Sequence, residues 1–227
     1  MKKIIFTLML LTLPSLSFAG ACDVNSDGLA ISSAGEICYK GDVQFLDIKE
    51  NHGILGGKIS RDRNAVVVVV DYRFDTSGMD PEDAYDLYKY GLVLFKVEDG
   101  NVVQRVISKG ERIKIEDPPK GLCQVKGIAI SNDGKTTYIE CPNYATSGGI
   151  HAVDNSTGKI SEEITAGSGV DIVGAGEFSG YILTSQHRYH DGGGSYDSYY
   201  LVSPDGKVKK RLTDDDKAAK DFLIKNR

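Results

Sequence analysis

An acidic loop near the start of the chain carries the donor types of a calcium site. Asp23, Asn25 and Asp27 place oxygen atoms at alternate positions, and Gly28 follows where such a loop turns. The position that normally supplies a bidentate glutamate is Ala34 here. We therefore favour an Asx-rich turn, keep calcium as the alternative, and expect no other cofactor.

A second group of polar side chains lies at residues 187–191, in the order His-Arg-Tyr-His-Asp. Histidine beside a carboxylate can ligate a metal or act as a general base. His187 and His190 are an odd number of residues apart, so they point to opposite faces of a strand. This spacing favours separate surface residues over a shared metal or catalytic site.

The sequence contains no motif for nucleophilic catalysis. Ser195 follows three glycines but lacks the Gly-x-Ser-x-Gly elbow of a hydrolase. Asp71, Glu140 and Glu177 are acids that only the folded chain can bring together. We therefore expect a protein that binds rather than one that catalyses.

The first 19 residues have the pattern of a secretory signal peptide. Lys2 and Lys3 precede an apolar run at 4–13, and small residues end the segment at Ala19. The run is too short to span a bilayer, so we expect a periplasmic or secreted protein without a transmembrane segment. Acylation of Cys22 in a lipoprotein is the alternative.

Four cysteines in an exported chain indicate two disulfides, for which three pairings exist. Cys123 and Cys141 lie ten and eight residues from Asp133, the centre of an Asn-Asp-Gly turn. They are therefore near neighbours across a hairpin, which predicts a Cys123–Cys141 bond. A Cys22–Cys38 bond follows by elimination.

The 227 residues carry a formal net charge of −5, with no basic cluster. This balance argues against a nucleic-acid partner. The length that remains after cleavage suits a single domain at 20–227.

Residues 122–166 have the pattern of four antiparallel strands. The strand-forming runs are 125–131, 136–141, 149–153 and 159–164. Asn-Asp-Gly at 132–134 supplies the chemistry of the first turn.

Within this unit, Gly-Ile-Ala-Ile-Ser-Asn-Asp-Gly-Lys-Thr-Thr-Tyr-Ile at 127–139 is followed by His-Ala-Val-Asp-Asn-Ser-Thr-Gly-Lys-Ile at 151–160. These residues resemble one blade of a β-propeller of the YVTN or WD40-like type. The resemblance implies repeated four-stranded blades, in families that are mostly binding scaffolds.

The same strand order recurs at 53–108 and at 168–213. We therefore predict an all-β fold: a small or incomplete β-propeller-like array of about three four-stranded antiparallel blades, tied by disulfides.

Four other segments have separate expectations. Residues 42–48 are expected to form a strand, either of an incomplete fourth unit or at a closing edge, and 80–88 a helical turn. Residues 111–121 are expected to form a connecting loop. Residues 214–224 fit a short helix or a final strand, and both remain open.

Three long crossovers, at 73–89, 143–148 and 188–198, should emerge on one face, because each joins the second and third strands of its unit. They are rich in tyrosine and glycine, which favours a binding face over ordinary loops. The predicted contact residues are Tyr85, Tyr88, Tyr144, Arg188, Tyr189, His190, Asp191, Ser195 and Tyr196.

We therefore expect a non-catalytic exported binding protein. In architecture and compartment it resembles the periplasmic immunity proteins that act against type VI secreted cell-wall amidases. The resemblance implies a protein partner, a secreted peptidoglycan hydrolase, whose cleft a loop occludes with Tyr189 or Tyr196 as anchor. The alternatives are a small envelope enzyme, a small-molecule or glycan-binding protein, and a passive envelope component.

Overall fold

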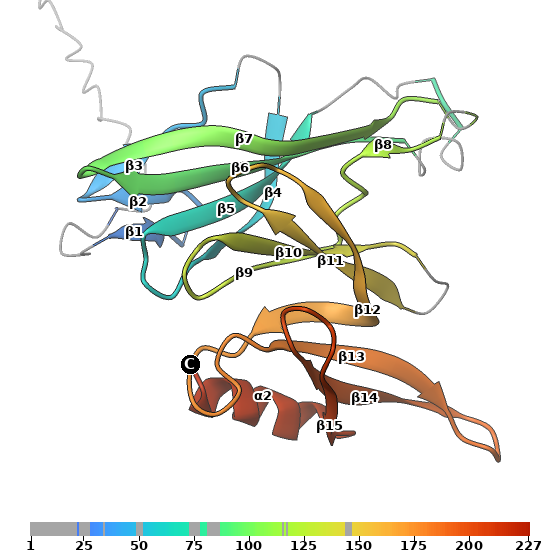
Figure 1. The fold of residues 1–227 in the computed structure, drawn as a ribbon. Helices are drawn as coiled ribbons and strands as arrows, with labels where there is room; N and C mark the ends of the chain where they lie inside the picture. The colour runs from blue at the N-terminus through green and yellow to red at the C-terminus, as the bar shows by residue number, and fades with distance from the viewer. Residues whose placement is uncertain are drawn as a thin grey trace, which may run out of the picture.

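The structure is a computed structural model that describes residues 22, 28–33, 35–48, 52–72, 78–80, 87–114, 116, 118–143 and 147–227. The predicted signal peptide, the candidate calcium residues Asp23, Asn25 and Asp27, and the binding candidates Tyr85 and Tyr144 lie outside these residues. So does most of the helical turn expected at 80–88. Figure 1 shows an all-β fold, as expected, with helix α2 (Asp216–Lys225) near the C-terminus.

The strands form three antiparallel sheets. A small sheet contains β1 (Leu29–Ile31), β2 (Ile37–Tyr39) and β3 (Asp42–Gln44). A five-stranded sheet contains β4 (His52–Ile59), β5 (Ala65–Tyr72), β6 (Tyr88–Glu98), β7 (Asn101–Arg112) and β8 (Lys120–Gly121). A seven-stranded sheet contains β9 (Gly127–Ile130), β10 (Thr136–Cys141), β11 (Gly148–Asp154), β12 (Ile160–Ile172), β13 (Ile182–Tyr189), β14 (Ser195–Val202) and β15 (Lys209–Thr213).

Strand β5 explains why the sheets stack. Its run of valines is buried along the whole length, as in a strand covered on both faces. Val67 and Val69 pack against β9, β10 and β11, whereas Val66 and Val68 pack against the small N-terminal sheet. Because side chains alternate along a strand, one apolar run contributes to two separate cores.

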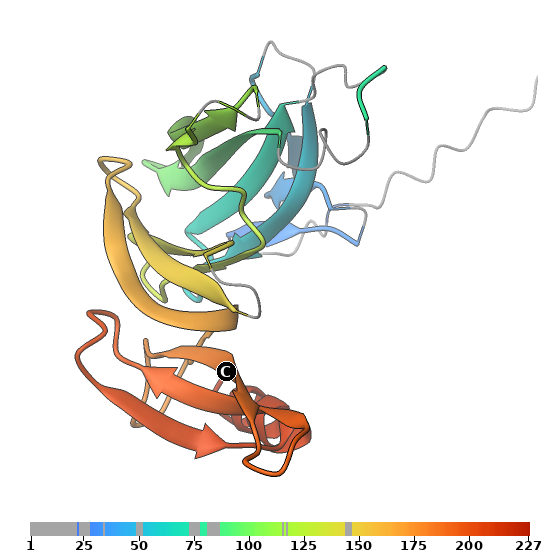
Figure 2. The ribbon, with the colours of Figure 1, turned by 90° about the vertical axis from the view of Figure 1, so that its right-hand side faces the viewer.

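The stacking continues through the molecule. The other face of β9, β10 and β11 packs on β13 and β14 through Tyr138, Ile150, Ile182 and Val202. The far face of β13 and β14 is covered by α2 through Leu183, Leu201 and Ala219. Figure 2 shows these layers stacked from the N-terminal sheet to the helix. The sheets therefore pack face to face.

Strand β12 belongs to two layers. It pairs with β11 as far as Gly167 and with β13 from Ser168 onward, so the seven-stranded sheet bends there. Gly169 has a φ of 72°, a conformation that favours glycine. Its N–H donates to Oε2 of the buried Glu140 at 2.9 Å. The chain thus passes from one four-stranded meander into the next without a loop.

Both expected disulfides are present. Cys123 bonds to Cys141 and Cys22 bonds to Cys38, with Cα–Cα distances of 5.7 Å and 5.6 Å. Cys123 lies outside β9, which begins at Gly127, so the bond ties the linker between sheets to β10 rather than joining two paired strands. The Cys123–Cys141 bond therefore cross-links the chain where it leads from the five-stranded sheet to the seven-stranded sheet.

Several boundaries differ from the expectation. Strand β7 continues to Arg112 and pairs with β8, where a connecting loop was expected. The C-terminal segment, for which a helix and a strand were both open, forms a helix. The side chain of Asp215 accepts the N–H of Ala218 and so caps the start of this helix. The segment at 42–48 contributes only β3, and the small sheet covers one face of the five-stranded sheet.

Candidate functional site

The strands that lead into the three expected crossovers end on one side of the molecule. The carboxyl ends of β5, β10 and β13 all point to the right in Figure 1. Much of the first two crossovers lies outside the described residues, so the β13–β14 hairpin is the part of this side that the structure describes fully. We define the recognition hairpin, named for the role proposed below, as residues 186–198.

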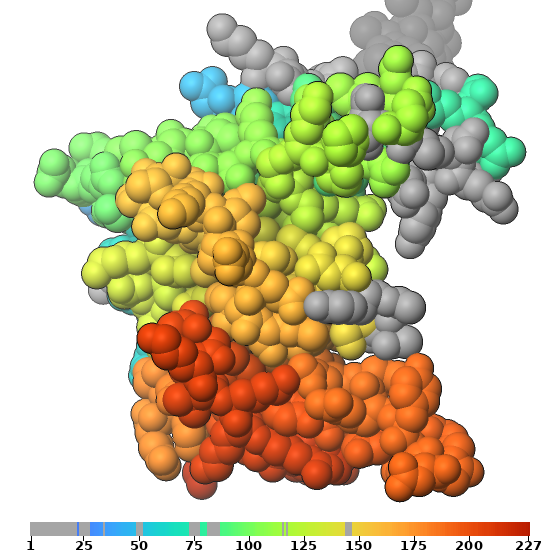
Figure 3. Space-filling model, turned by 45° about the vertical axis from the view of Figure 1, so that its right-hand side comes forward, coloured from blue at the N-terminus to red at the C-terminus, as the bar shows by residue number. Residues whose placement is uncertain are grey.

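The recognition hairpin is a two-stranded ribbon. β13 and β14 pair continuously from Ile182 with Val202 to Tyr189 with Ser195. On one flank β12 pairs with β13 only up to Ser185, and on the other β15 pairs with β14 only from Tyr199. The outer half of the hairpin therefore extends beyond its neighbouring strands, and it protrudes at the lower right of Figure 3.

Two hydrogen bonds anchor the base of the hairpin. The side-chain amide of Gln186 donates to the carbonyl of Ala166 in the β12 bend at 2.5 Å. On the other strand, Ser198 Oγ donates to Asp214 Oδ1, also at 2.5 Å. An isolated two-stranded ribbon is marginally stable in water, so these contacts and the core below them hold the ribbon in place.

One face of the hairpin combines cations with tyrosine. Arg188 donates to Gln186 Oε1 at 2.6 Å and to the hydroxyl of Tyr200 at 3.2 Å. Lys209 Nζ, from β15, lies 4.5 Å from the centre of the Tyr200 ring. Neither cation forms an ion pair with a carboxylate among the described residues. This face therefore carries uncompensated positive charge.

The pKa values of Tyr200 and Lys209 are set by burial and by the neighbouring charges. Burial alone raises the pKa of Tyr200, but the hydrogen bond from Arg188 and the charges of Arg188 and Lys209 outweigh it, so the pKa lies below its usual value. Burial also lowers the pKa of Lys209.

The opposite face carries the most exposed tyrosine of the hairpin. Tyr189 is 68% exposed and makes an edge contact with the ring of His187, whose Nδ1 lies 3.1 Å from Asp197 Oδ1. His190 instead stacks on Tyr196 at 4.5 Å between ring centres. The two histidines thus have different partners, on opposite faces of the hairpin.

The hairpin ends in a glycine turn. His190 N–H donates to the carbonyl of Gly194 at 3.1 Å, and Gly193 N–H donates to the carbonyl of His190 at 3.0 Å. Gly193 and Gly194 have φ values of 92° and 84°. Asp191 and Ser195 lie at this tip and are exposed.

Tyr88 differs from the expectation. It is the first residue of β6, is only 7% exposed, and stacks on Tyr90 with ring centres 5.5 Å apart. It belongs to the sheet because the pairing of β6 with β7 extends to Arg112. Tyr88 is therefore removed from the set of contact residues.

Sequence reasoning missed Tyr200 and Lys209. Tyr196, Ser198 and Tyr200 alternate along β14 and so share one face, which is a signal the sequence contains. The position of Lys209 beside them depends on the pairing of β15 with β14 and carries no local signal.

No group of three or more metal-binding side chains occurs among the residues that the structure describes. In the same part of the chain, no helix is long and apolar enough to cross a membrane. Glu140, one of the acids considered in the sequence analysis, accepts the N–H of Gly169 in the β12 bend.

Comparison with known proteins gave little. No protein-family model and no curated protein matches the chain. Among solved structures, an acylaminoacyl peptidase in complex with Z-Gly-Gly-Phe-chloromethyl ketone has a TM-score of 0.42 and 11% identity, over 71% of this chain and 25% of the peptidase. Pyrococcus horikoshii acylaminoacyl peptidase has a TM-score of 0.42 and 11% identity over 72% and 25%.

A protein from Bacteroides uniformis assigned as a 6-phosphogluconolactonase has a TM-score of 0.29 and 10% identity, over 81% of this chain and 62% of the other. The chain spans about a quarter of the length of the two peptidases. Similarity at this level indicates no function for this chain.

Proposed function

We propose that this chain is a non-catalytic exported protein that binds a protein partner through the recognition hairpin. The observation that carries the proposal is the outer half of the β13–β14 ribbon, which extends beyond its neighbouring strands. It presents the exposed ring of Tyr189 on one face and Arg188 with Tyr196 on the other. Tyrosine and arginine are the residues most often found at the energetic centre of an interface.

The shape of the hairpin suits insertion into a concave surface. A narrow ribbon anchored at its base loses little conformational freedom on binding, which favours affinity. Arg188 and Lys209 make one side of it positive, so the complementary surface should be acidic on that side. We propose a secreted peptidoglycan hydrolase as the partner, with the hairpin occluding its cleft.

We further propose that the three meanders, β4–β7, β9–β12 and β12–β15, are blades of an open propeller-like array. The face-to-face stacking and the passage of β12 from one meander to the next support this arrangement. Export after cleavage near Ala19 belongs to the same proposal, and the two disulfides support it because such bonds persist in oxidising compartments.

The test uses secreted peptidoglycan hydrolases of the same cells and of competing cells. The purified protein should inhibit one of them, measured as the rate at which cell walls are degraded. Tyr189→Ala and Tyr196→Ala should each weaken the complex by more than about 1 kcal/mol, the scale of an interface anchor. The binding constant comes from calorimetric titration.

Phe45→Ala is the matched control, because Phe45 is an 83% exposed aromatic outside the hairpin. It should leave both inhibition and affinity unchanged. The proposal fails if no secreted hydrolase is inhibited by an excess of the protein, or if both tyrosine variants inhibit as well as the unmodified chain.

A further inference from the structure

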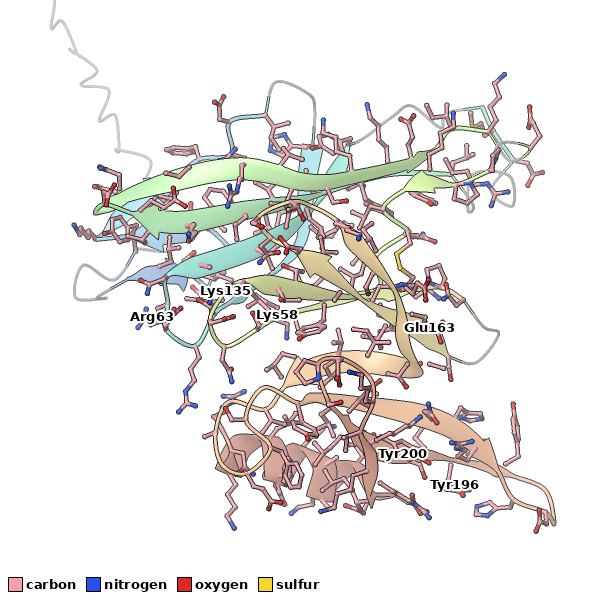
Figure 4. The ribbon with its side chains drawn as sticks, in the orientation of Figure 1. Lys58, Arg63, Lys135, Glu163, Tyr196 and Tyr200 are labelled. Atoms are coloured by element: carbon pink, nitrogen blue, oxygen red, sulfur yellow. A yellow bond between two sulfur atoms is a disulfide. The ribbon has the colours of Figure 1, made fainter. Side chains whose placement is uncertain are left out.

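A second feature lies away from the recognition hairpin, where β1, β4, β9 and the second half of β12 converge. A cleft of about 590 Å³ opens there between the β4–β5 turn and the β12–β13 connection. In Figure 4, Lys58 and Arg63 mark this region on the left of the molecule, whereas Tyr196 and Tyr200 lie at the lower right. The cleft is therefore separate from the proposed protein-binding surface.

The cleft is lined by more cations than acids. Lys58, Arg61, Arg63 and Arg227 line it, and Asp171 is the one acidic side chain among the described lining residues. The whole chain has a formal charge of −5, so the excess of cations around this cleft is opposite in sign to the net charge of the protein. A cleft that concentrates one sign of charge attracts ligands of the other sign.

The arginines are held in place without losing their charge. Arg63 Nε donates to the carbonyl of Leu29 at 3.1 Å, and Arg61 donates to the carbonyl of Gly174. Both acceptors are neutral. A guanidinium group has five N–H donors, so each side chain keeps donors for a ligand. These bonds orient the arginines, and neither arginine forms an ion pair with a carboxylate of the residues that the structure describes.

Among the described residues, Lys58 has one charged partner, Asp171. Its Nζ lies 3.6 Å from Asp171 Oδ1, and the two side chains are 48% and 53% exposed. An ion pair this open to solvent contributes little and is easily exchanged for another anion. Asp171 thus competes with a ligand for Lys58.

The wall between the charges is apolar. Ile31 from β1, Ile59 from β4, Ile130 from β9 and Ile172 from β12 line it. A volume of this size, with apolar walls and a few converging polar groups, is typical of small-molecule sites.

We propose that this cleft binds a small organic anion, a carboxylate or a phosphate ester with an apolar body. The anionic group contacts Lys58, Arg61 and Arg63, and the apolar body covers the isoleucine wall. This site goes beyond the proposed function and does not depend on it.

The test uses 8-anilinonaphthalene-1-sulfonate, a fluorescent organic anion, as the probe. Its fluorescence should rise on titration with the folded protein, and benzoate or phenyl phosphate should displace it. The more effective competitor identifies the anionic group. Neutral N-phenyl-1-naphthylamine, at the same concentration, should bind at least about tenfold more weakly, because it cannot use the cations.

Two substitutions should act in opposite directions. Lys58→Met should weaken probe binding about fivefold, and Asp171→Asn should tighten it by a similar factor, because it removes the competing carboxylate. Because partly unfolded proteins also bind this probe, each variant must keep the unfolding midpoint and near-UV circular dichroism of the unmodified chain for its change in affinity to count. Lys135→Met is the matched control, because Lys135 lies outside the cleft and pairs with Asp133 at 3.3 Å.

The proposal is overturned if the probe does not bind, if the neutral analogue binds equally well, or if Asp171→Asn weakens binding. Tyr189→Ala, at the recognition hairpin, should leave probe affinity unchanged. Loss of hydrolase inhibition in that variant with probe binding intact separates the two proposals.

Discussion

At the scale of single residues, one turn is used three times. Ser60 Oγ donates to Asp62 Oδ1, Ser131 Oγ to Asp133 Oδ1, and Ser203 Oγ to Asp205 Oδ1, at 2.6 to 2.8 Å. In each case the serine hydroxyl also accepts the N–H of the residue five positions later. The turn is closed by side chains as well as by the backbone.

The sequence indicated two of these turns through Asp-Gly, at 133–134 and 205–206. It did not indicate the turn at 60–65, where Arg63 replaces glycine and has a φ of 57°. The serine also went unnoticed, because its role depends on the carboxylate folding back toward it. Local composition predicts a turn, but the hydrogen bonds that close it are set by three-dimensional geometry.

The carboxylate of Asp205 should make stability depend on pH. Hydrogen bonds from Ser203 and from the N–H of Lys207 lower its pKa from 3.8 to about 2. A group whose pKa falls on folding stabilises the protein above its unfolded pKa and loses that contribution as the pH drops through the folded pKa. The loss is therefore expected between about pH 4 and pH 2.

Asp205→Asn tests this contribution. The variant should be less stable than the unmodified chain at pH 6, and the difference should shrink as the pH falls toward 2. Urea denaturation at a series of pH values measures it. Asp191→Asn, outside these turns, is the control. A difference that stays constant across the series contradicts the assignment.

At the scale of elements, β12 is the instructive case. The sequence predicted one unit that ends with the strand at 159–164 and a separate unit that begins at 168. The structure has a single strand, Ile160–Ile172, that pairs with β11 and then with β13. The segment 166–169 has the sequence Ala-Gly-Ser-Gly, a composition that is typical of a loop. A strand that bends sharply requires the same small residues, so composition does not distinguish the two.

Gly169→Ala tests whether the bend requires glycine. A Cβ at this position meets no atom within 4 Å, so the cost comes from the φ of 72° alone. We expect the free energy of unfolding to fall by about 1 kcal/mol. Gly192→Ala in the hairpin tip also has open space, and no positive φ, so it should change stability much less. Equal effects of the two variants on the free energy of unfolding would show that the bend does not require glycine.

The recognition hairpin was partly predictable. Its glycine tip and the opposed histidines followed from turn composition and from the alternation of side chains. The long crossover predicted at 188–198 is mostly strand, because β13 continues to Tyr189 and β14 begins at Ser195. The protrusion of the hairpin was not predictable, because it results from β12 and β15 ending their pairing at Ser185 and Tyr199. Where neighbouring strands stop is decided by packing between layers.

At the scale of the whole molecule, each disulfide joins a segment outside the strands to a strand of a sheet. Cys22–Cys38 joins the start of the described chain to the small sheet, and Cys123–Cys141 fastens the linker that follows β8. Each spans a short stretch of sequence, 16 and 18 residues. Cross-links of this length restrict the unfolded chain.

Replacing Cys123 and Cys141 together by serine should lower the free energy of unfolding by roughly 3 kcal/mol, measured by urea denaturation. The Cys22→Ser, Cys38→Ser pair should have a similar effect, because the closed loops are nearly equal in length. If reduction of the unmodified protein leaves its unfolding midpoint unchanged, the cross-links contribute nothing to stability and this expectation is wrong.

The sequence by itself determined most strands of the three repeated units, most of their turns and the disulfide pairing. These features depend on residues close together in the chain, through side-chain alternation and turn chemistry. Only the tertiary structure decided that β5 serves two cores, that Tyr88 is buried, and that Lys58, Arg61 and Arg63 gather at one cleft. Those outcomes depend on which sheets pack against each other, and contacts between residues distant in sequence leave no local pattern.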